Sequence, residues 1–239
     1  MKNRFLPIIA GIAAISASAA AQDAPVEDGA YIRLGAGVSI AGDWEQDLAF
    51  NMDPSGPFSA GSLPPTEQQL DFSEGLTAAA ALGFDYADGI RTELEYRYSK
   101  ADIDQVTLLG GFTEENGSDP VSFDPDAEIK AHFLMTNFFF DFANSSPLTP
   151  FIGGGVGGAF VSNENAERDA ALAYQGRAGV SLEMGTGFTA DFEYIYLRTN
   201  ELEFGPSADE FTAEGPFGRA ATGDRYQSSS VMVSLRRRF

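Results

Sequence analysis

The amino-acid sequence predicts an all-β fold, an eight-stranded antiparallel up-and-down transmembrane β-barrel with short periplasmic turns and long extracellular loops. Three observations predict this fold. Apolar and polar side chains alternate along several segments, tight glycine-containing turns alternate with long connections, and the polar faces of the segments carry charges of both signs. Alternation with a period of two separates the two faces of a strand, whereas a helix would mix them.

The first 21 residues are expected to be a signal peptide that is removed from the mature protein. Lys2 and Arg4 supply positive charge, residues 5–15 are apolar, and residues 19–21 are alanines, which is the pattern of a cleaved leader. The apolar run is too short to cross a bilayer, and a short anchor is the alternative. Residues 22–239 then form one outer-membrane β-barrel domain, and the expected location is the cell outer membrane.

Alternation continues through eight segments of the mature chain. In the third segment, Leu94 and Tyr96 share one face, while Glu93, Glu95 and Arg97 share the other. The segments are expected at about residues 30–40, 75–86, 90–100, 129–142, 149–162, 172–184, 188–199 and 226–239.

The connections between these segments alternate in length. Three are tight turns at residues 87–89, 144–147 and 185–187, and four are long, at residues 41–74, 101–128, 163–171 and 200–225. Asp-Gly and Gly-rich sequences permit the positive φ angles of tight hairpins. In a membrane barrel the short turns lie on the periplasmic side and the long loops outside. An even number of strands places both termini in the periplasm.

The polar faces carry nearly balanced charges in a chain whose formal net charge is −20. The expected lumen network draws on Arg33, Arg91, Arg97, Arg177, Arg236 and Arg238, with Asp85, Glu93, Glu95, Asp141, Glu183, Asp191 and Glu193. Opposite charges can pair in a narrow interior, and an eight-stranded barrel has a lumen that side chains just fill. A plugged lumen is therefore expected, with a narrow pore as the alternative. Ile195 is an apolar exception on the polar face. A soluble β-sandwich, the alternative fold, would instead turn its charges outward.

The composition excludes some classes of function. The acidic balance argues against a nucleic-acid partner, because phosphate binding needs a basic surface. The chain has no cysteine and therefore no disulfide. The acidic side chains gather in the long connections and are interpreted as solvated surface. None of these segments has the D-x-[DN]-x-[DN]-G pattern of a calcium loop, and binding of divalent cations by these loops is left open.

Two motifs that can carry chemistry have simpler explanations. Gly153, Gly155 and Gly158 satisfy G-x-G-x-x-G but lie inside a predicted strand, where a nucleotide site would need a helix to follow. His132 is the only histidine, and Leu134 stands where a His-x-Ser pair would have its serine. The sequence therefore predicts no catalytic residue, no cofactor site and no metal site.

Several segments together resemble one family. Leu148 to Gly157, Ala173 to Ser181, Thr92 to Tyr98 and Met135 to Phe142 resemble its strand motifs of the forms TPYxGxGxG, AYQxxAGV, xELxYRY and MxNxYYDF. The family is the outer-membrane β-barrel domain family, which includes small opacity-protein and OmpA/OmpX-like surface barrels. The resemblance implies that Phe239 is the signal read by the barrel-assembly machinery. Arg237 departs from the pattern, which favours an apolar residue there.

The resemblance implies a non-enzymatic outer-membrane surface protein, in which the barrel is an anchor and the acidic loops serve envelope integrity or surface interaction. The alternative is a narrow porin or channel for small solutes or ions, and a lipid-modifying barrel enzyme is a third hypothesis. The expected partners are outer-membrane lipid, lipopolysaccharide and the barrel-assembly machinery. An extracellular ligand is left unidentified.

Overall fold

The computed structural model describes residues 28–42, 44–50, 67–86, 88–111, 119–125, 127–163, 168–185, 187–204 and 219–239. The elements in these ranges are β-strands joined by turns and irregular segments. Within the same ranges, no helix is both long and apolar enough to cross a bilayer. The expected signal peptide, residues 1–21, lies outside the described residues, so its cleavage stays a prediction.

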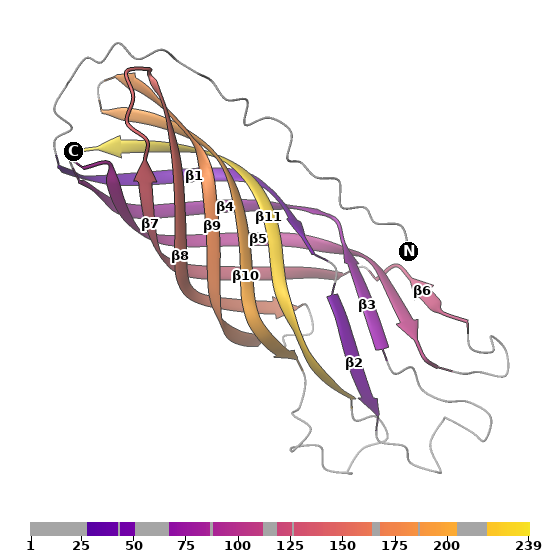
Figure 1. Ribbon diagram of the computed structural model, residues 1–239. Coiled ribbons are helices and arrows are strands. Elements are labelled where there is room, and N and C mark those ends of the chain that lie inside the picture. The colour runs from indigo at the N-terminus through magenta and orange to yellow at the C-terminus, as the bar shows by residue number, and fades with distance from the viewer. Residues whose placement is uncertain are drawn as a thin grey trace, which may run out of the picture.

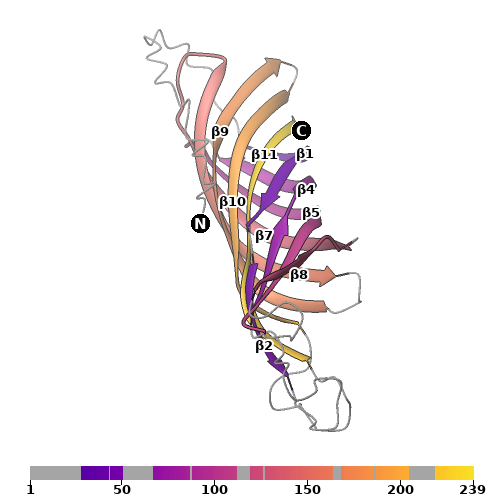
Figure 2. The ribbon, with the colours of Figure 1, turned by 90° about the vertical axis from the view of Figure 1, so that its right-hand side faces the viewer.

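Eight strands form a closed antiparallel barrel (Figures 1 and 2). They are β1 (Gly29–Ala41), β4 (Glu74–Tyr86), β5 (Ile90–Leu109), β7 (Ala127–Asp141), β8 (Leu148–Asn163), β9 (Arg168–Gly185), β10 (Phe188–Phe204) and β11 (Arg219–Arg238). Each pairs with the next in this order, and β1 pairs with β11 from Tyr31↔Arg238 to Ala41↔Ser228. Closure leaves no strand edge unpaired in the hydrocarbon, where water cannot satisfy the backbone. The predicted fold is confirmed.

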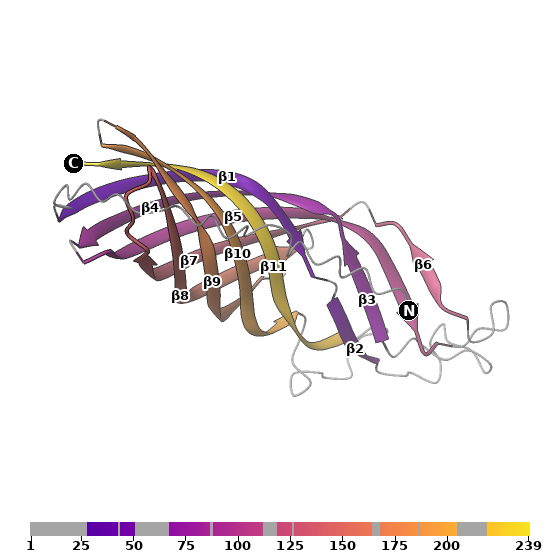
Figure 3. The same ribbon diagram turned by 45° about the horizontal axis from the view of Figure 1, so that its top comes forward.

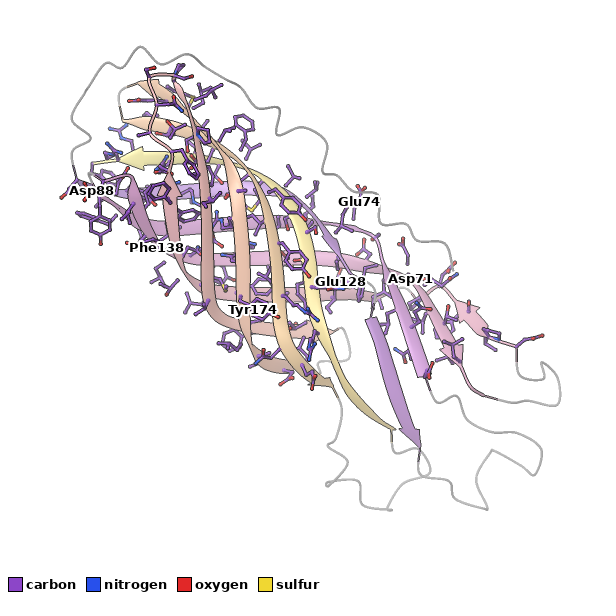
Figure 4. All side chains as sticks on the ribbon, viewed as in Figure 1. Asp71, Glu74, Asp88, Glu128, Phe138 and Tyr174 are labelled. Atoms are coloured by element: carbon purple, nitrogen blue, oxygen red, sulfur yellow. The ribbon has the colours of Figure 1, made fainter. Side chains whose placement is uncertain are left out.

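The two faces of the barrel have the polarity of a membrane protein. In β5, Glu93, Glu95 and Arg97 are at most 2% exposed, whereas Leu94 is 52% exposed. Large apolar side chains cover the outer face, as Phe138 and Tyr174 show in Figure 4. A water-soluble sandwich would have the opposite arrangement, so this outer surface is suited to lipid.

The barrel wall continues beyond the predicted strands on the side of the long connections. The additional strands are β2 (Trp44–Phe50), β3 (Glu67–Phe72) and β6 (Val121–Phe123), which project together from one end of the barrel (Figures 1 and 3). β2 and β3 keep the register of β1 and β4, so the first hairpin is one long ribbon. The prediction of loops throughout residues 41–74, 101–128, 163–171 and 200–225 was therefore wrong in part, because strand pairing continues past the regular apolar alternation.

The tight turns lie at the opposite end, which the barrel rule assigns to the periplasm. Gly89, Gly185 and Gly187 have φ angles of 75°, 79° and 77°, a region that glycine occupies without steric cost. The turn between β7 and β8 instead depends on Asn144, whose Oδ1 accepts from the Ser146 backbone N–H at 2.7 Å. The strands β5, β8 and β10 begin directly after the three positions where the turns were predicted.

Several glycines of β8 leave no room for a Cβ against the neighbouring strand β7. A Cβ added to Gly157 would lie 2.0 Å from the Leu134 carbonyl oxygen and 2.8 Å from the Met135 Cα. A Cβ on Gly155 would lie 2.0 Å from Oδ1 of Asn137. The glycine motif thus serves close strand packing, and β8 is followed by β9 rather than a helix.

Gly157→Ala should therefore lower the free energy of unfolding by about 1–3 kcal/mol, the range seen when extra atoms are forced into packed interiors. The matched control is Gly176→Ala on β9, because a Cβ at Gly176 meets nothing within 4 Å. Denaturant titration of the protein refolded in vesicles measures both variants. An equal loss in the two would contradict the close packing of β8 against β7.

Candidate functional site

The centre of the lumen holds a buried ion-pair network built from opposite walls. Arg33 on β1 contacts Glu93 at 2.8 Å and Glu193 on β10 at 2.7 Å. Arg177 on β9 contacts Glu193 and Glu95, each at 2.6 Å, and Arg33 also pairs with Glu95. These side chains are at most 2% exposed. Two guanidinium groups and three carboxylates therefore bridge the lumen.

A second group of pairs lies toward the periplasmic turns. Arg91 donates to both carboxylate oxygens of Asp141, at 2.6 and 2.8 Å, a bidentate geometry that strengthens the contact. Arg236 pairs with Asp191 at 3.3 Å. Arg238, whose side chain is 40% exposed, pairs with Asp85 at the barrel end. Charge pairing therefore continues from the lumen centre to the periplasmic end.

Arg97 marks the extracellular border of the charged layer. Its Nη2 donates to Glu95 at 2.6 Å, its side chain is 1% exposed, and its Nε has no hydrogen-bond partner. Its register partner on β7 is Phe133. Nearby in sequence on β7, Asn137 accepts from Gln175 at 2.6 Å. The interior changes from ionic to apolar at this level.

An apolar layer fills the lumen above the charges. Its buried members are Ala41, Leu70, Ala101, Val106, Ile129, Ala131, Phe133, Met135, Ala159, Val161, Ala173, Leu197, Leu202 and Tyr226. The rings of Phe133 and Tyr226 lie 5.6 Å apart across the layer. The sequence analysis did not predict this layer, although the apolar residues Ile129, Phe133 and Met135 at alternate positions of β7 indicated it. The lumen is thus filled by two stacked layers of different chemistry.

Most residues proposed for the lumen network are buried inside the barrel. These are Arg91, Glu93, Glu95, Arg97, Arg177, Asp191, Glu193 and Arg236, and Asp141 is half-buried. The prediction that Glu183 belongs to the lumen network was wrong, because Glu183 is exposed. Glu183 keeps the strand register, with Thr189 as its partner, but it lies at the end of the barrel beside the turn, where burial ends.

The structure also places three other residues that the sequence analysis discussed, namely Phe239, Arg237 and His132. Phe239 is 76% exposed at the periplasmic end, and its backbone N–H donates to the Ala30 carbonyl at 3.0 Å. Arg237 lies over the ring of Phe188 at 4.4 Å. His132 faces outward from β7, with its Nδ1 2.7 Å from the Tyr96 hydroxyl. In the described ranges, no group of three or more His, Cys, Asp or Glu side chains is placed to hold a metal ion.

A closed eight-stranded barrel with charges inside and an apolar exterior defines the class: this is a small outer-membrane β-barrel protein. The chain belongs to the Surface antigen family, which it matches over residues 50–190. It is similar to the outer membrane protein PagN of Salmonella typhimurium, with 24% identity covering 94% of this chain and 96% of PagN.

Two further comparisons concern the fold and the share of each chain that is matched. An uncharacterized Brucella abortus protein is 26% identical over 54% of this chain, and the match spans only 54% of the Brucella protein. The crystal structure of Neisserial surface protein A superposes with a TM-score of 0.54 at 13% identity, covering 89% of this chain and 99% of that one. At this identity the structural likeness supports the fold alone.

Proposed function

We propose that the protein is a non-enzymatic, non-conducting surface protein of the outer membrane. The barrel acts as an anchor, and the segments projecting outside serve envelope integrity or surface interaction. The observation that carries the proposal is the filled lumen. Arg33, Glu95 and Arg177 are at most 4% exposed in the ionic layer, and Phe133 and Met135 are fully buried in the apolar layer.

Both layers would have to rearrange before an ion could cross. Opening the ionic layer would separate buried charges, which is costly once each has lost its partner. Opening the apolar layer would expose packed side chains to water. The segments on the side of the long connections are acidic in part, as Glu67, Asp102 and Asp119 are exposed, so they offer a hydrated surface to the outside.

Conductance in planar lipid bilayers tests the proposal. The refolded full-length chain should show no steady open state, because no water-filled path is expected through the two layers. Glu95→Gln should also stay closed, since the amide keeps the shape of the side chain. Glu201→Gln, at an exposed pair with Arg225, is the control outside the lumen. A steady single-channel current that Glu95→Gln changes and Glu201→Gln does not would overturn the proposal in favour of the channel.

A further inference from the structure

A pair of lysines stands out on the outer face of the barrel. Lys100 on β5 and Lys130 on β7 are direct cross-strand partners, and Lys2 is the only other lysine in the sequence. Their side chains are 41% and 44% exposed. In a chain with net charge −20, two adjacent ammonium groups on the outer wall are unusual.

The two lysines lie at the height of the outer membrane interface. Ten residues separate Lys100 from Ile90, which follows the periplasmic turn, and ten separate Lys130 from Phe140, the register partner of Ile90. A strand rises about 3.3 Å per residue, and at a tilt of about 40° this gives a height of roughly 25 Å, the height of the apolar band in such barrels. The ammonium groups therefore reach the headgroup level of the outer leaflet.

Three successive cross-strand pairs form ordered rows on this outward face. Tyr98 lies opposite His132, Lys100 opposite Lys130, and Asp102 opposite Glu128. Counted from the membrane outward, the rows are aromatic, cationic and anionic, and Figure 4 shows Glu128 on this part of the wall. Aromatic side chains typically lie where acyl chains meet headgroups, so the cationic row is placed just above the acyl chains.

The aromatic row is held together by direct contacts. The Tyr96 hydroxyl lies 2.7 Å from Nδ1 of His132, and the rings of Tyr98 and His132 are 5.0 Å apart. Because Nδ1 is engaged with Tyr96, Nε2 is the ring nitrogen available to a headgroup. The rings of Tyr96, Tyr98 and His132 therefore form one aromatic cluster on the membrane side of the two lysines.

The cationic row pairs with the anionic row above it, in which Asp102 and Glu128 supply two carboxylates. Glu128 pairs with both Lys100 and Lys130. Each ammonium group has three N–H donors, and the contacts with Glu128 use one on each lysine, so donors remain on both for a further anion. By contrast, Arg225 on the other side of the rim pairs with the carboxylate of Glu201 at 2.8 Å.

We propose that Lys100 and Lys130 bind a phosphate group of a phosphorylated glycolipid in the outer leaflet, whose acyl chains lie against Tyr96, Tyr98 and His132. A phosphate beside the two ammonium groups accepts charge-assisted hydrogen bonds from the N–H donors that Glu128 does not use. The acidic row above then meets the hydrated side of the headgroup. This inference depends on the outer-membrane location and is independent of whether the lumen conducts.

The test measures binding of bisphosphorylated lipid A to the refolded full-length chain in phosphatidylcholine nanodiscs, by native mass spectrometry over a lipid A titration. The double variant Lys100→Ala/Lys130→Ala should bind about tenfold more weakly, the loss expected for charge-assisted hydrogen bonds at an exposed site. Lys100→Arg/Lys130→Arg should retain binding. Arg225→Ala, at the exposed rim pair with Glu201, should bind as the unmodified protein does.

Two chemical controls separate a lipid phosphate from other causes. Lipid A lacking both phosphates should bind weakly and equally to all variants, and inorganic phosphate at millimolar concentration should not displace bisphosphorylated lipid A. The retained gel-mobility shift between unheated and boiled samples confirms that each variant is folded. Equal loss in Arg225→Ala, tight binding of the dephosphorylated lipid, or displacement by inorganic phosphate would each overturn the inference.

Discussion

Replacing Glu95 with alanine should lower the free energy of unfolding by about 3–5 kcal/mol, the cost of removing one partner from a buried ionic network. Glu95 is completely buried and accepts hydrogen bonds from Arg33, Arg97 and Arg177. Its loss would leave three guanidinium groups in the lumen without their shared anion. Glu95→Gln should cost less, because the amide oxygen still accepts a hydrogen bond while the negative charge is lost.

Guanidinium titration of protein refolded in lipid vesicles gives this free energy, with the folded fraction read from the mobility of unheated samples on gels. The control is Glu201→Ala, which removes a carboxylate that is 62% exposed and pairs with Arg225. Exposed pairs contribute about 1 kcal/mol or less, so this variant should stay close to the unmodified protein. A loss for Glu95→Ala no greater than that of Glu201→Ala would show that the lumen network does not stabilise the barrel.

The sequence was sufficient to predict the barrel because the membrane imposes a simple rule on each strand. Leu94 and Glu95 are adjacent in the chain, yet one is 52% exposed and the other 0%. Alternation with a period of two arises because one face of each strand contacts lipid and the other faces the packed interior of the barrel. Beyond the membrane, the two faces of a strand no longer have such different surroundings, so alternation no longer identifies the strand. Strands such as β2 and β3 were therefore not predicted.

The interior was predicted less completely than the wall. Ile195 looked like an exception on a polar face, but it is fully buried with Ala79 and Met232. Alternation identifies which side chains point inward and cannot say that the inward side is ionic at one level and apolar at the next. Inward positions such as Phe133 and Met135 carried a local apolar signal, but grouping them into one layer requires the strand register around the whole ring.

The pairing within the network also depended on the closed structure. Arg33 contacts Glu193, a residue 160 positions away in the chain, because β1 and β10 both flank β11. The residue types predicted an ionic lumen, whereas the partners follow from ring closure. Glu183 illustrates a second limit, since its place at the barrel end beside a turn leaves it exposed although it keeps the strand register.

Placing lysine at Leu94 should lower the free energy of unfolding by about 2–4 kcal/mol, the cost measured for a cation on the lipid face near the middle of the membrane. Leu94 lies four residues from Ile90 at the periplasmic end of β5 and six from Lys100 at the outer rim. An ammonium group at this level is far from both interfaces, which limits how well it can snorkel to a headgroup.

The matched control is Val121→Lys in β6, where the residue replaced is 40% exposed and belongs to the connection outside the membrane. Because an ammonium group there remains in water, the same titration should show a change within about 0.5 kcal/mol. The contrast between these two exposed apolar positions depends only on what surrounds them. If both substitutions were neutral when the barrel is folded in lipid, Leu94 would be facing water, and the outer wall could not be the membrane-facing surface.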